Sequence, residues 1–486
     1  MRSRFTLTRL AAALVLACAV AVSGCASRDD TDIGSGGGSG GGGGRSAAAQ
    51  AQTPGAPLQD PEEWVSRNGL LRARLDVSRR QVDVAGRKLW ALTYNGRYMP
   101  PTLRIRPGDK LELEVRNRLD KYTNVHVHGL HVSPSGNADN VFVHIHPGET
   151  FHYSYQFLKT IEPGTYWYHS HAHPMSAAQV AGGMSGAIIV DGLKQYLPPS
   201  LRNITEHVIG LKDFQVQGDS IKTKDLHIGS ATTRTINGQL KPVIRIRPGE
   251  YQLWRLANIS ANIYYKLHLE GQKFQVIAQD ASPVDRIWSA DSLLIAAGAR
   301  YDVLVRGGPA GRTQLQTLAY STGSAGNQFP KEQLATVVSE GAAVPPVELP
   351  ATFAPREDLD NATLAARRTL VFSENAAGDK FYINGKQFDM DRIDVRSRLN
   401  TVEEWTVRND SDEEHSFHVH TNHFQLMSVN GRPYDARSMQ DTANVPARGQ
   451  IVIRNKFSDY TGKTVFHCHI LNHEDEGMMA TLEIVK

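Results

Sequence analysis

The chain has 486 residues, of which 40% are hydrophobic and 21% are charged. This is the composition of a globular protein with several domains, and it excludes a disordered, collagen-like or polytopic membrane chain. The 53 basic residues barely exceed the 50 acidic ones, and the surplus falls within residues 1–24, which hold three arginines and no acid. No nucleic-acid partner is therefore expected. Three cysteines are too few for a disulfide scaffold, whereas 19 histidines require an explanation.

The N-terminal residues 1–24 predict an export signal. A basic start is followed by an apolar run from Leu10 to Val22, which is too short to cross a bilayer comfortably. The sequence Val22-Ser23-Gly24-Cys25 resembles a bacterial lipobox, in which cleavage precedes the cysteine and the cysteine receives a lipid. Residues 25–64, rich in glycine and serine, predict a flexible tether. We therefore expect an exported, extracytoplasmic lipoprotein attached to the membrane through Cys25.

A repeated pattern divides the remaining chain into three. Each repeat has an Asn-Gly pair followed by an alternating apolar segment that reaches another asparagine, and successive pairs lie 142 and 147 residues apart. The pairs are Asn95-Gly96, Asn237-Gly238 and Asn384-Gly385, and the later asparagines are Asn117, Asn258 and Asn409. Period-two alternation and frequent turn residues predict an all-β fold of antiparallel sandwiches or barrels. We expect domains at 65–197, 198–345 and 362–486, with a linker at 346–361.

Histidines two residues apart occur far more often than chance allows. Random placement would give about 0.7 His-x-His pairs, whereas the sequence has six. These are His126/His128, His144/His146, His169/His171, His171/His173, His418/His420 and His467/His469. On a strand, such residues point to the same face, so each pair can present two imidazoles to one metal site. Imidazole suits zinc, copper, iron and nickel, so histidine alone does not select the metal.

The last histidine motif contains a cysteine and indicates copper. It reads His467-Cys468-His469 and is followed by His473 and Met478. If this segment is extended, Cys468 points away from the face that carries the two flanking histidines, so one strand serves two metal sites. A thiolate with two imidazoles and a weak axial methionine is the ligand set of a blue-copper centre. Cys468, His473 and Met478 supply three of these ligands, and His415 is the best candidate for the second imidazole.

From about residue 65 to its end, the sequence resembles the three-domain multicopper oxidases, which include laccase, bilirubin oxidase and cuprous oxidase. Four motifs carry the resemblance: His126-Val127-His128-Gly129, His169-Ser170-His171, His415-Ser416-Phe417-His418-Val419-His420, and His467 through Met478. The resemblance implies three consecutive cupredoxin-like Greek-key domains and four copper ions. It assigns the type 1 copper to His415, Cys468, His473 and Met478. It assigns the type 2 copper to His126 and His418, and the type 3 pair to His128, His169, His171, His420, His467 and His469.

The resemblance also implies a reaction. A small reducing substrate gives up electrons one at a time near His473, the electrons pass through Cys468, and the trinuclear cluster reduces O₂ to water. Glu474 matches an acid that relays protons in bacterial relatives, and Asp139 matches an acid downstream of the first motif. With Met478 as the axial ligand, we expect a low-to-medium type 1 potential.

Several residues depart from the family pattern or fall outside it. The flanks His173-Pro174-Met175 and His420-Thr421-Asn422-His423 are unusual, which affects the expected shape of the pocket rather than copper binding. His144 and His146 lie where the family has other residues; they either form an extra copper site or, as we favour, take no part. The second domain has only His207, His227 and His268, so we expect it to carry no catalytic copper and to hold the other two domains in register.

Three functions fit this set of residues. The favoured one is a laccase-like oxidation of phenols, aromatic amines or tetrapyrroles by a monomeric enzyme with O₂ as acceptor. The second is a metallo-oxidase acting on Cu(I), Fe(II) or Mn(II); cuprous relatives often carry a methionine-rich insert, whereas the nine methionines here are scattered. The third is a non-catalytic assembly module, but such proteins typically lose ligands that this sequence keeps.

Overall fold

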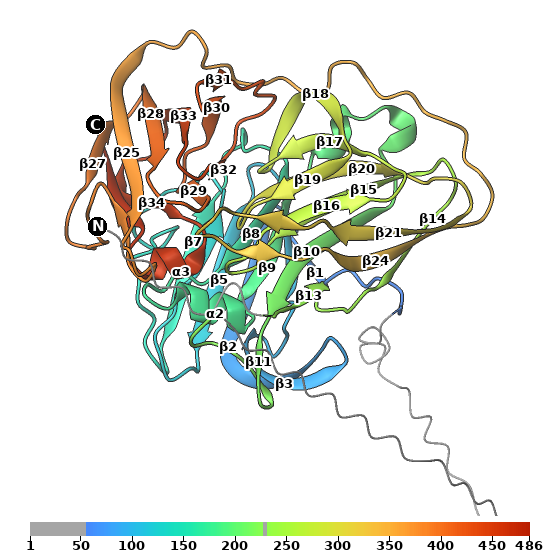
Figure 1. The fold of residues 1–486 in the computed structure, drawn as a ribbon, viewed down its shortest axis with the longest axis horizontal. Helices are drawn as coiled ribbons and strands as arrows, with labels where there is room; N and C mark the ends of the chain where they lie inside the picture. The colour runs from blue at the N-terminus through green and yellow to red at the C-terminus, as the bar shows by residue number, and fades with distance from the viewer. Residues whose placement is uncertain (1–54, 227–230) are drawn as a thin grey trace, which may run out of the picture. The chain divides into compact units, whose positions relative to one another are not determined.

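A computed structural model describes residues 55–226 and 231–486 (Figure 1). The expected signal, Cys18, Cys25, most of the tether and His227 lie outside these residues. Residues 55–64, expected to belong to the tether, are instead part of the folded body, because Leu58 donates its N–H to Val243 O at 2.8 Å and Asp60 contacts His207. No helix in the described ranges is long and apolar enough to cross a membrane.

The first part of the body, blue to green in Figure 1, consists of two sheets. The five-stranded sheet has the order β1 (Glu63–Val65), β4 (Thr102–Ile105), β9 (Ser185–Val190), β8 (Gly164–His169), β6 (His126–His128). The six-stranded sheet has the order β11 (Val216–Gln217), β12 (Ser220–Ile221), β3 (Arg87–Tyr94), β2 (Leu70–Val84), β5 (Lys110–Asn117), β7 (Thr150–Gln156). Apolar and polar residues alternate in the sequence, and buried and partly buried side chains alternate in the same way in the structure. In β5, for example, Leu111, Leu113 and Val115 point into the core. The short strands β11 and β12 join this sheet from beyond the expected boundary at residue 197.

The second part repeats the arrangement. Its six-stranded sheet has the order β13 (Thr233–Ile236), β10 (Glu206–Phe214), β15 (Tyr251–Asn258), β20 (Arg300–Arg306), β17 (Phe274–Gln279), β18 (Ser282–Ala290). Its five-stranded sheet has the order β14 (Val243–Ile246), β24 (Glu332–Ser339), β21 (Gly311–Thr317), β16 (Tyr265–Leu269), β19 (Ser292–Ile295). A separate pair is formed by β22 (Tyr320–Ser321) and β23 (Gln328–Phe329).

The third part, orange to red in Figure 1, is built in the same way. Its six-stranded sheet has the order β26 (Phe381–Ile383), β25 (Leu364–Glu374), β28 (Thr401–Asn409), β33 (Gln450–Phe457), β30 (Phe424–Val429), β31 (Arg432–Pro433). Its five-stranded sheet has the order β27 (Val395–Arg398), β35 (Met479–Val485), β34 (Gly462–Cys468), β29 (His415–Val419), β32 (Thr442–Val445). The all-β fold class is confirmed, with three consecutive two-sheet domains.

The repeated asparagines have the same structural role in each domain. In all three Asn-Gly pairs both residues have φ between 54° and 78°, which is the backbone of a tight hairpin turn that asparagine and glycine tolerate. Asn117, Asn258 and Asn409 are buried at the ends of β5, β15 and β28. Each donates its side-chain Nδ2 to two or three backbone carbonyls of the following loops. In the first and third domains, one of these bonds is to a carbonyl of the loop that leads to a histidine motif, Lys121 and Glu413 respectively.

Helices are few and short. The helix α2 (Ser176–Gly182) follows the second histidine motif, and α3 (Leu471–Asp475) follows β34; they lie side by side in Figure 1. Asp475 of α3 accepts the backbone N–H groups of Ser176 and Ala177 at 3.0 and 2.8 Å, so it caps α2 from the third domain. Two 3₁₀ turns cover Leu193–Tyr196 and Pro199–Leu201. Residues 346–361, the expected linker, contain no helix or strand.

Candidate metal centres

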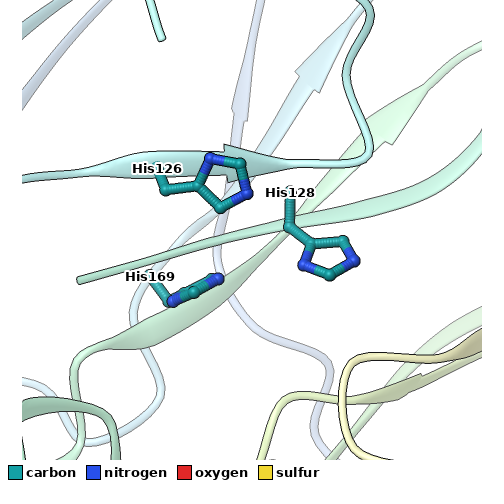
Figure 2. Close-up of side chains that lie close together, drawn as sticks. All are labelled: His126, His128 and His169. Atoms are coloured by element: carbon teal, nitrogen blue, oxygen red, sulfur yellow. The ribbon is translucent and has the colours of Figure 1, made fainter. Parts of the chain in front are cut away.

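The histidine motifs lie at the ends of neighbouring strands in the first and third domains. On β6, His126 is directly opposite His169, the last residue of β8, and Figure 2 shows these two rings with that of His128. In the third domain, His418 on β29 is directly opposite His467 on β34. The two domains therefore present their imidazoles in the same way, as the spacing of two residues on a strand predicts.

Eight buried histidines come together in one cluster, which we call the eight-histidine site. It consists of His126, His128, His169, His171, His418, His420, His467 and His469. Possible ligand atoms within 4.8 Å of one another combine both domains, as in His126 with His418 and His420, and in His171 with His420 and His467. The Nε2 atom of His467 lies 3.3 Å from that of His171 and 3.0 Å from that of His420. The site therefore lies where the first and third domains meet.

Four of these rings are held from outside through one nitrogen. His126 Nδ1 lies 3.0 Å from Asp139, and His128 Nε2 lies 3.0 Å from Asp441 Oδ1. His169 Nδ1 and His418 Nδ1 each donate to a backbone carbonyl, at 2.9 and 2.8 Å. The other ring nitrogen of each has no hydrogen-bond partner among the described residues. Buried polar atoms are rarely left so, and metal ions bound within the site would satisfy these nitrogens.

Burial sets the charge of these imidazoles. It lowers the pKa of His169 to about 3, and burial together with neighbouring imidazoles lowers the pKa of His126, His171 and His420 well below the usual range. His128, His467 and His469 shift in the same direction for the same reason. These seven shifts favour the neutral imidazole, which is the form that binds metal.

The two predicted acids lie beside this cluster. Asp139 is buried, bonds to His126 Nδ1 and accepts the N–H of Val127 at 3.1 Å. Burial raises its pKa to about 8. Glu474 is also buried, with its oxygens 3.1 Å from His467 Nδ1 and 3.6 Å from His171 Nδ1. Burial raises the pKa of Glu474 well above its usual value, and the charge of Asp475 adds to the effect.

A second site, which we call the Cys468 site, consists of His415, Cys468 and His473. The Sγ atom lies 3.6 Å from His415 Nδ1 and 3.8 Å from His473 Nδ1, and the two nitrogens are 3.2 Å apart. Trigonal coordination with bonds of the lengths seen for zinc would separate the ligand atoms by about 3.5–3.8 Å. The spacing therefore fits one ion bound by all three. Met478 is buried nearby, and its backbone oxygen accepts the N–H of Cys468 at 3.0 Å.

Outer partners also fix the two imidazoles of the Cys468 site. Ser411 donates its hydroxyl to Asn409, so His415 Nε2–H donates to Ser411 Oγ at 2.8 Å. His473 Nε2 lies 3.3 Å from Glu413 Oε1. Both Nδ1 atoms are thus left for a metal ion. Burial raises the pKa of the Cys468 thiol, so its thiolate requires a cation beside it.

The position of His473 differs in one respect from the sequence expectation. The strand β34 ends at Cys468, and the chain then turns into α3, which carries His473 and Glu474. The alternation at residues 467–469 nevertheless holds, because Cys468 lies in one site while His467 and the ring of His469 lie in the other.

Three residues at these sites carry no motif and were missed in the sequence. Asp441 accepts hydrogen bonds from Nη1 and Nη2 of Arg300, each at 2.6 Å. It also contacts His128 Nε2. Glu413 contacts His473. Their partners are far away in the chain, and no spacing in a single sequence points to them.

The remaining histidines of the described residues belong to neither site, although His423 Nε2 lies 2.7 Å from the carbonyl of Gly129 and 3.8 Å from Asp441. His144 stacks on Tyr122, with ring centroids 4.3 Å apart, and neither it nor His146 belongs to any group of three converging His, Cys, Asp or Glu side chains within the described ranges. In the second domain His207 contacts Asp60, and His268 Nδ1 donates to the carbonyl of Asp291.

Comparison with known proteins agrees with this fold and these side chains. Multicopper oxidase family profiles match residues 76–195, 206–330 and 357–486. The multicopper oxidase mco of Staphylococcus aureus is 27% identical over 409 residues, which cover 81% of this chain and 84% of that protein. A laccase of Bacillus stratosphericus is 23% identical over 478 residues, which cover 83% and 92%. Among solved structures, a multicopper oxidase from Campylobacter jejuni described as a metallo-oxidase is 27% identical, with a TM-score of 0.79 over 89% of this chain and 96% of that one.

The three cupredoxin-like domains and the thiolate and imidazole ligands define a copper-binding oxidoreductase. The chain belongs to the multicopper oxidase family.

Proposed function

We propose that this protein couples the one-electron oxidation of a reducing substrate at the Cys468 site to the reduction of O₂ to water at the eight-histidine site. The observation that carries this proposal is the position of Cys468. Its side chain belongs to one site. Its two chain neighbours belong to the other: His467 is grouped there with His171 and His420, and the His469 ring packs against His128 and His169. The two sites are therefore linked by a covalent path of a few bonds.

The ligand geometry supports four copper ions, distributed as the family resemblance implies. The type 1 ion takes His415, Cys468, His473 and Met478. The type 2 ion takes His126 and His418, and the type 3 pair takes His128, His169, His171, His420, His467 and His469. Bound copper would supply the one-electron redox steps and the reduction of O₂.

The protein's own acids supply protons for water formation. Burial raises the pKa of Glu474 and so favours its protonated form, and the carboxyl lies against two imidazoles of the eight-histidine site. Asp139 holds a proton below about pH 8 and is bonded to a third imidazole. Both groups can give a proton to a reacting oxygen and take one back from water.

The surface beside His473 supports a cationic electron donor. His473 lines a hollow of about 890 Å³ that also has six carboxylates and two lysines along its walls. The carboxylates are Asp225, Glu374, Asp379, Glu413, Asp475 and Glu476. Burial, with the nearby Glu374, raises the pKa of Glu413 to about 8, and a bound cation would relieve that repulsion. We therefore propose a metal ion such as Cu(I) or Fe(II) as the first candidate electron donor, ahead of the phenols that the sequence analysis favoured.

A phenol or aromatic amine is the second candidate donor. The observation in its favour is the size of the hollow, which is typical of sites for organic ligands and exceeds the need of a single ion. A laccase is also among the relatives.

Copper loading tests the coupled reaction. The purified protein, saturated with copper, should bind four ions per chain, show a thiolate-to-copper absorption band and consume O₂ with a reducing substrate. Fewer than four ions, or no such band, would contradict the proposal.

The donor is tested with Glu413→Gln, against Asp379→Asn in the same hollow as control. Loss of a charge-assisted contact should raise KM for Fe(II) or Cu(I) by about 10- to 100-fold and leave KM for a methoxyphenol nearly unchanged. The control should change neither. An equal change for both donors, or a rise for the phenol alone, would refute the metal-ion assignment.

We also propose that the protein is exported and anchored through a lipid on Cys25. This rests on the lipobox-like sequence at residues 22–25. Labelling of cells with a fatty acid should mark the wild-type protein and not Cys25→Ala; labelling of both or of neither would refute the anchor.

A further inference from the structure

A buried arginine of the second domain joins all three domains beside the eight-histidine site. Arg300, the first residue of β20, directs Nη1 and Nη2 at the two oxygens of Asp441, each at 2.6 Å. Its Nε donates to the carbonyl of Thr165 on β8 at 3.1 Å. Both members of the ion pair are fully buried, and paired donors on a carboxylate fix its plane as well as its position.

Asp441 in turn holds two of the eight histidines. His128 Nε2–H donates to its Oδ1 at 3.0 Å, and His418 Nδ1–H donates to its backbone oxygen at 2.8 Å. The two rings, one from the first domain and one from the third, stack at 3.8 Å with an interplanar angle of 14°. Because these nitrogens are occupied, His128 Nδ1 and His418 Nε2 are the atoms left for metal.

The surroundings leave this group no room to move. A Cβ on Gly129, which follows His128 and has φ +84°, would lie 2.5 Å from both Arg300 Nη2 and Asp441 Oδ2. On the other side, Asp280 accepts the backbone N–H of Arg300 at 3.0 Å and that of Thr442 at 3.3 Å. Without the guanidinium, the Asp441 carboxylate would lose both bonds from Arg300 and keep only those to Oδ1, from the Thr442 hydroxyl at 2.8 Å and from His128.

We propose that Arg300 is a positioning residue of the eight-histidine site. Through Asp441 it sets the ring orientation and the protonated nitrogen of His128, and it anchors the backbone that orients His418. The second domain, which lends no ligand, thus aligns the ligands of the other two. This inference rests on the copper site proposed above.

The test compares Arg300→Lys with Arg255→Lys. Arg255 on β15 is equally buried in the second domain, and its guanidinium contacts Glu206 and Asp302 instead. A lysine keeps the charge but cannot hold a carboxylate through two parallel bonds. Arg300→Lys should retain the thiolate-to-copper band and bind the coppers of the eight-histidine site about 10- to 100-fold more weakly, whereas Arg255→Lys should bind them as the wild type does. Metal analysis at graded chelator concentrations measures both, and electron-paramagnetic spectra identify the copper that is lost.

Equal copper retention in the two variants, or equal loss, would overturn the inference, since neither distinguishes Arg300 from any buried arginine. A metal-free readout separates its failure from failure of the proposed function. In the apoprotein, the His128 Nε2–H held by Asp441 should give a slowly exchanging downfield proton resonance, identified by its loss in Asp441→Asn. Arg300→Lys should shift or broaden this resonance and Arg255→Lys should not; an unchanged resonance in both would refute the role of Arg300 even if the wild type bound no copper at all.

Discussion

Gly298 of the second domain lies against a ligand of the eight-histidine site, so adding one methyl group there should displace a ring. Gly298 has φ +86°, and a Cβ would lie 2.9 Å from Cγ and Cδ2 of His469. Non-bonded carbons prefer about 3.5–4.0 Å, so Gly298→Ala should push the imidazole by about 0.5–1 Å. A misplacement of that size at a reacting centre can cost about 100-fold in rate. The left-handed backbone adds roughly 1–2 kcal/mol of lost stability.

The control for this prediction is Gly271→Ala. Gly271 also lies in the second domain and has φ +67°, but nothing lies within 4 Å of its Cβ position. Both variants should lose similar stability in urea unfolding, while only Gly298→Ala should lose O₂ uptake and copper from the eight-histidine site. O₂ uptake of Gly298→Ala within threefold of Gly271→Ala would refute the reasoning.

Three further outcomes follow from buried groups. Cys468→Ser should abolish the thiolate-to-copper band and donor oxidation while the other coppers stay bound, as spectra and metal analysis would reveal; a retained band would remove Cys468 from the site. Burial raises the pKa of Glu206, but the charges of Arg255 and Arg104 outweigh burial and hold this pKa well below its usual range. The stabilisation from ionised Glu206 is therefore present above pH 4.5 and is lost as the pH falls. Glu206→Gln should therefore cost about 3 kcal/mol at neutral pH and flatten the acid side of the stability profile in urea titrations; an unchanged slope would contradict this. Lys212 donates to three buried carbonyls of the first domain, and Lys212→Met should cost at least about 3 kcal/mol, measured against the wild type by urea unfolding. A loss below 1 kcal/mol would mean that these carbonyls find other partners.

Local pattern was enough to predict the elements that depend on neighbours in the chain. The Asn-Gly turns, the strand alternation and the two-residue spacing of the histidines all follow from backbone geometry, and the structure has them where the sequence places them. The resemblance to the family indicated which residues from distant segments come together. Spacing within a single sequence does not carry that information.

Contacts between domains were beyond the reach of the sequence. Arg300 and Asp441 lie 141 residues apart, one at the start of β20 and the other just before β32, and no motif marks them as partners. Glu413 likewise resembles any solvated acid within Asp412-Glu413-Glu414 until the fold sets it against His473. Residues 55–64 were assigned to the tether because the Gly-rich composition precedes them, whereas their own apolar and hydrogen-bonding groups attach them to the body.

The buried asparagine of each domain allows the three domains to be compared position by position. Nine residues after it stand His126, Leu267 and His418, and eleven residues after it stand His128, Leu269 and His420. The strands at these positions, β6, β16 and β29, pair with β8, β21 and β34 in their sheets; β6 ends its sheet, whereas β19 and β32 lie beyond the other two. The second domain keeps the strand that carries histidines in the other two domains, but at the histidine positions it has two fully buried leucines. Of three equivalent strand positions, only those in the first and third domains can therefore offer imidazoles, which limits the eight-histidine site to the place where these two domains meet.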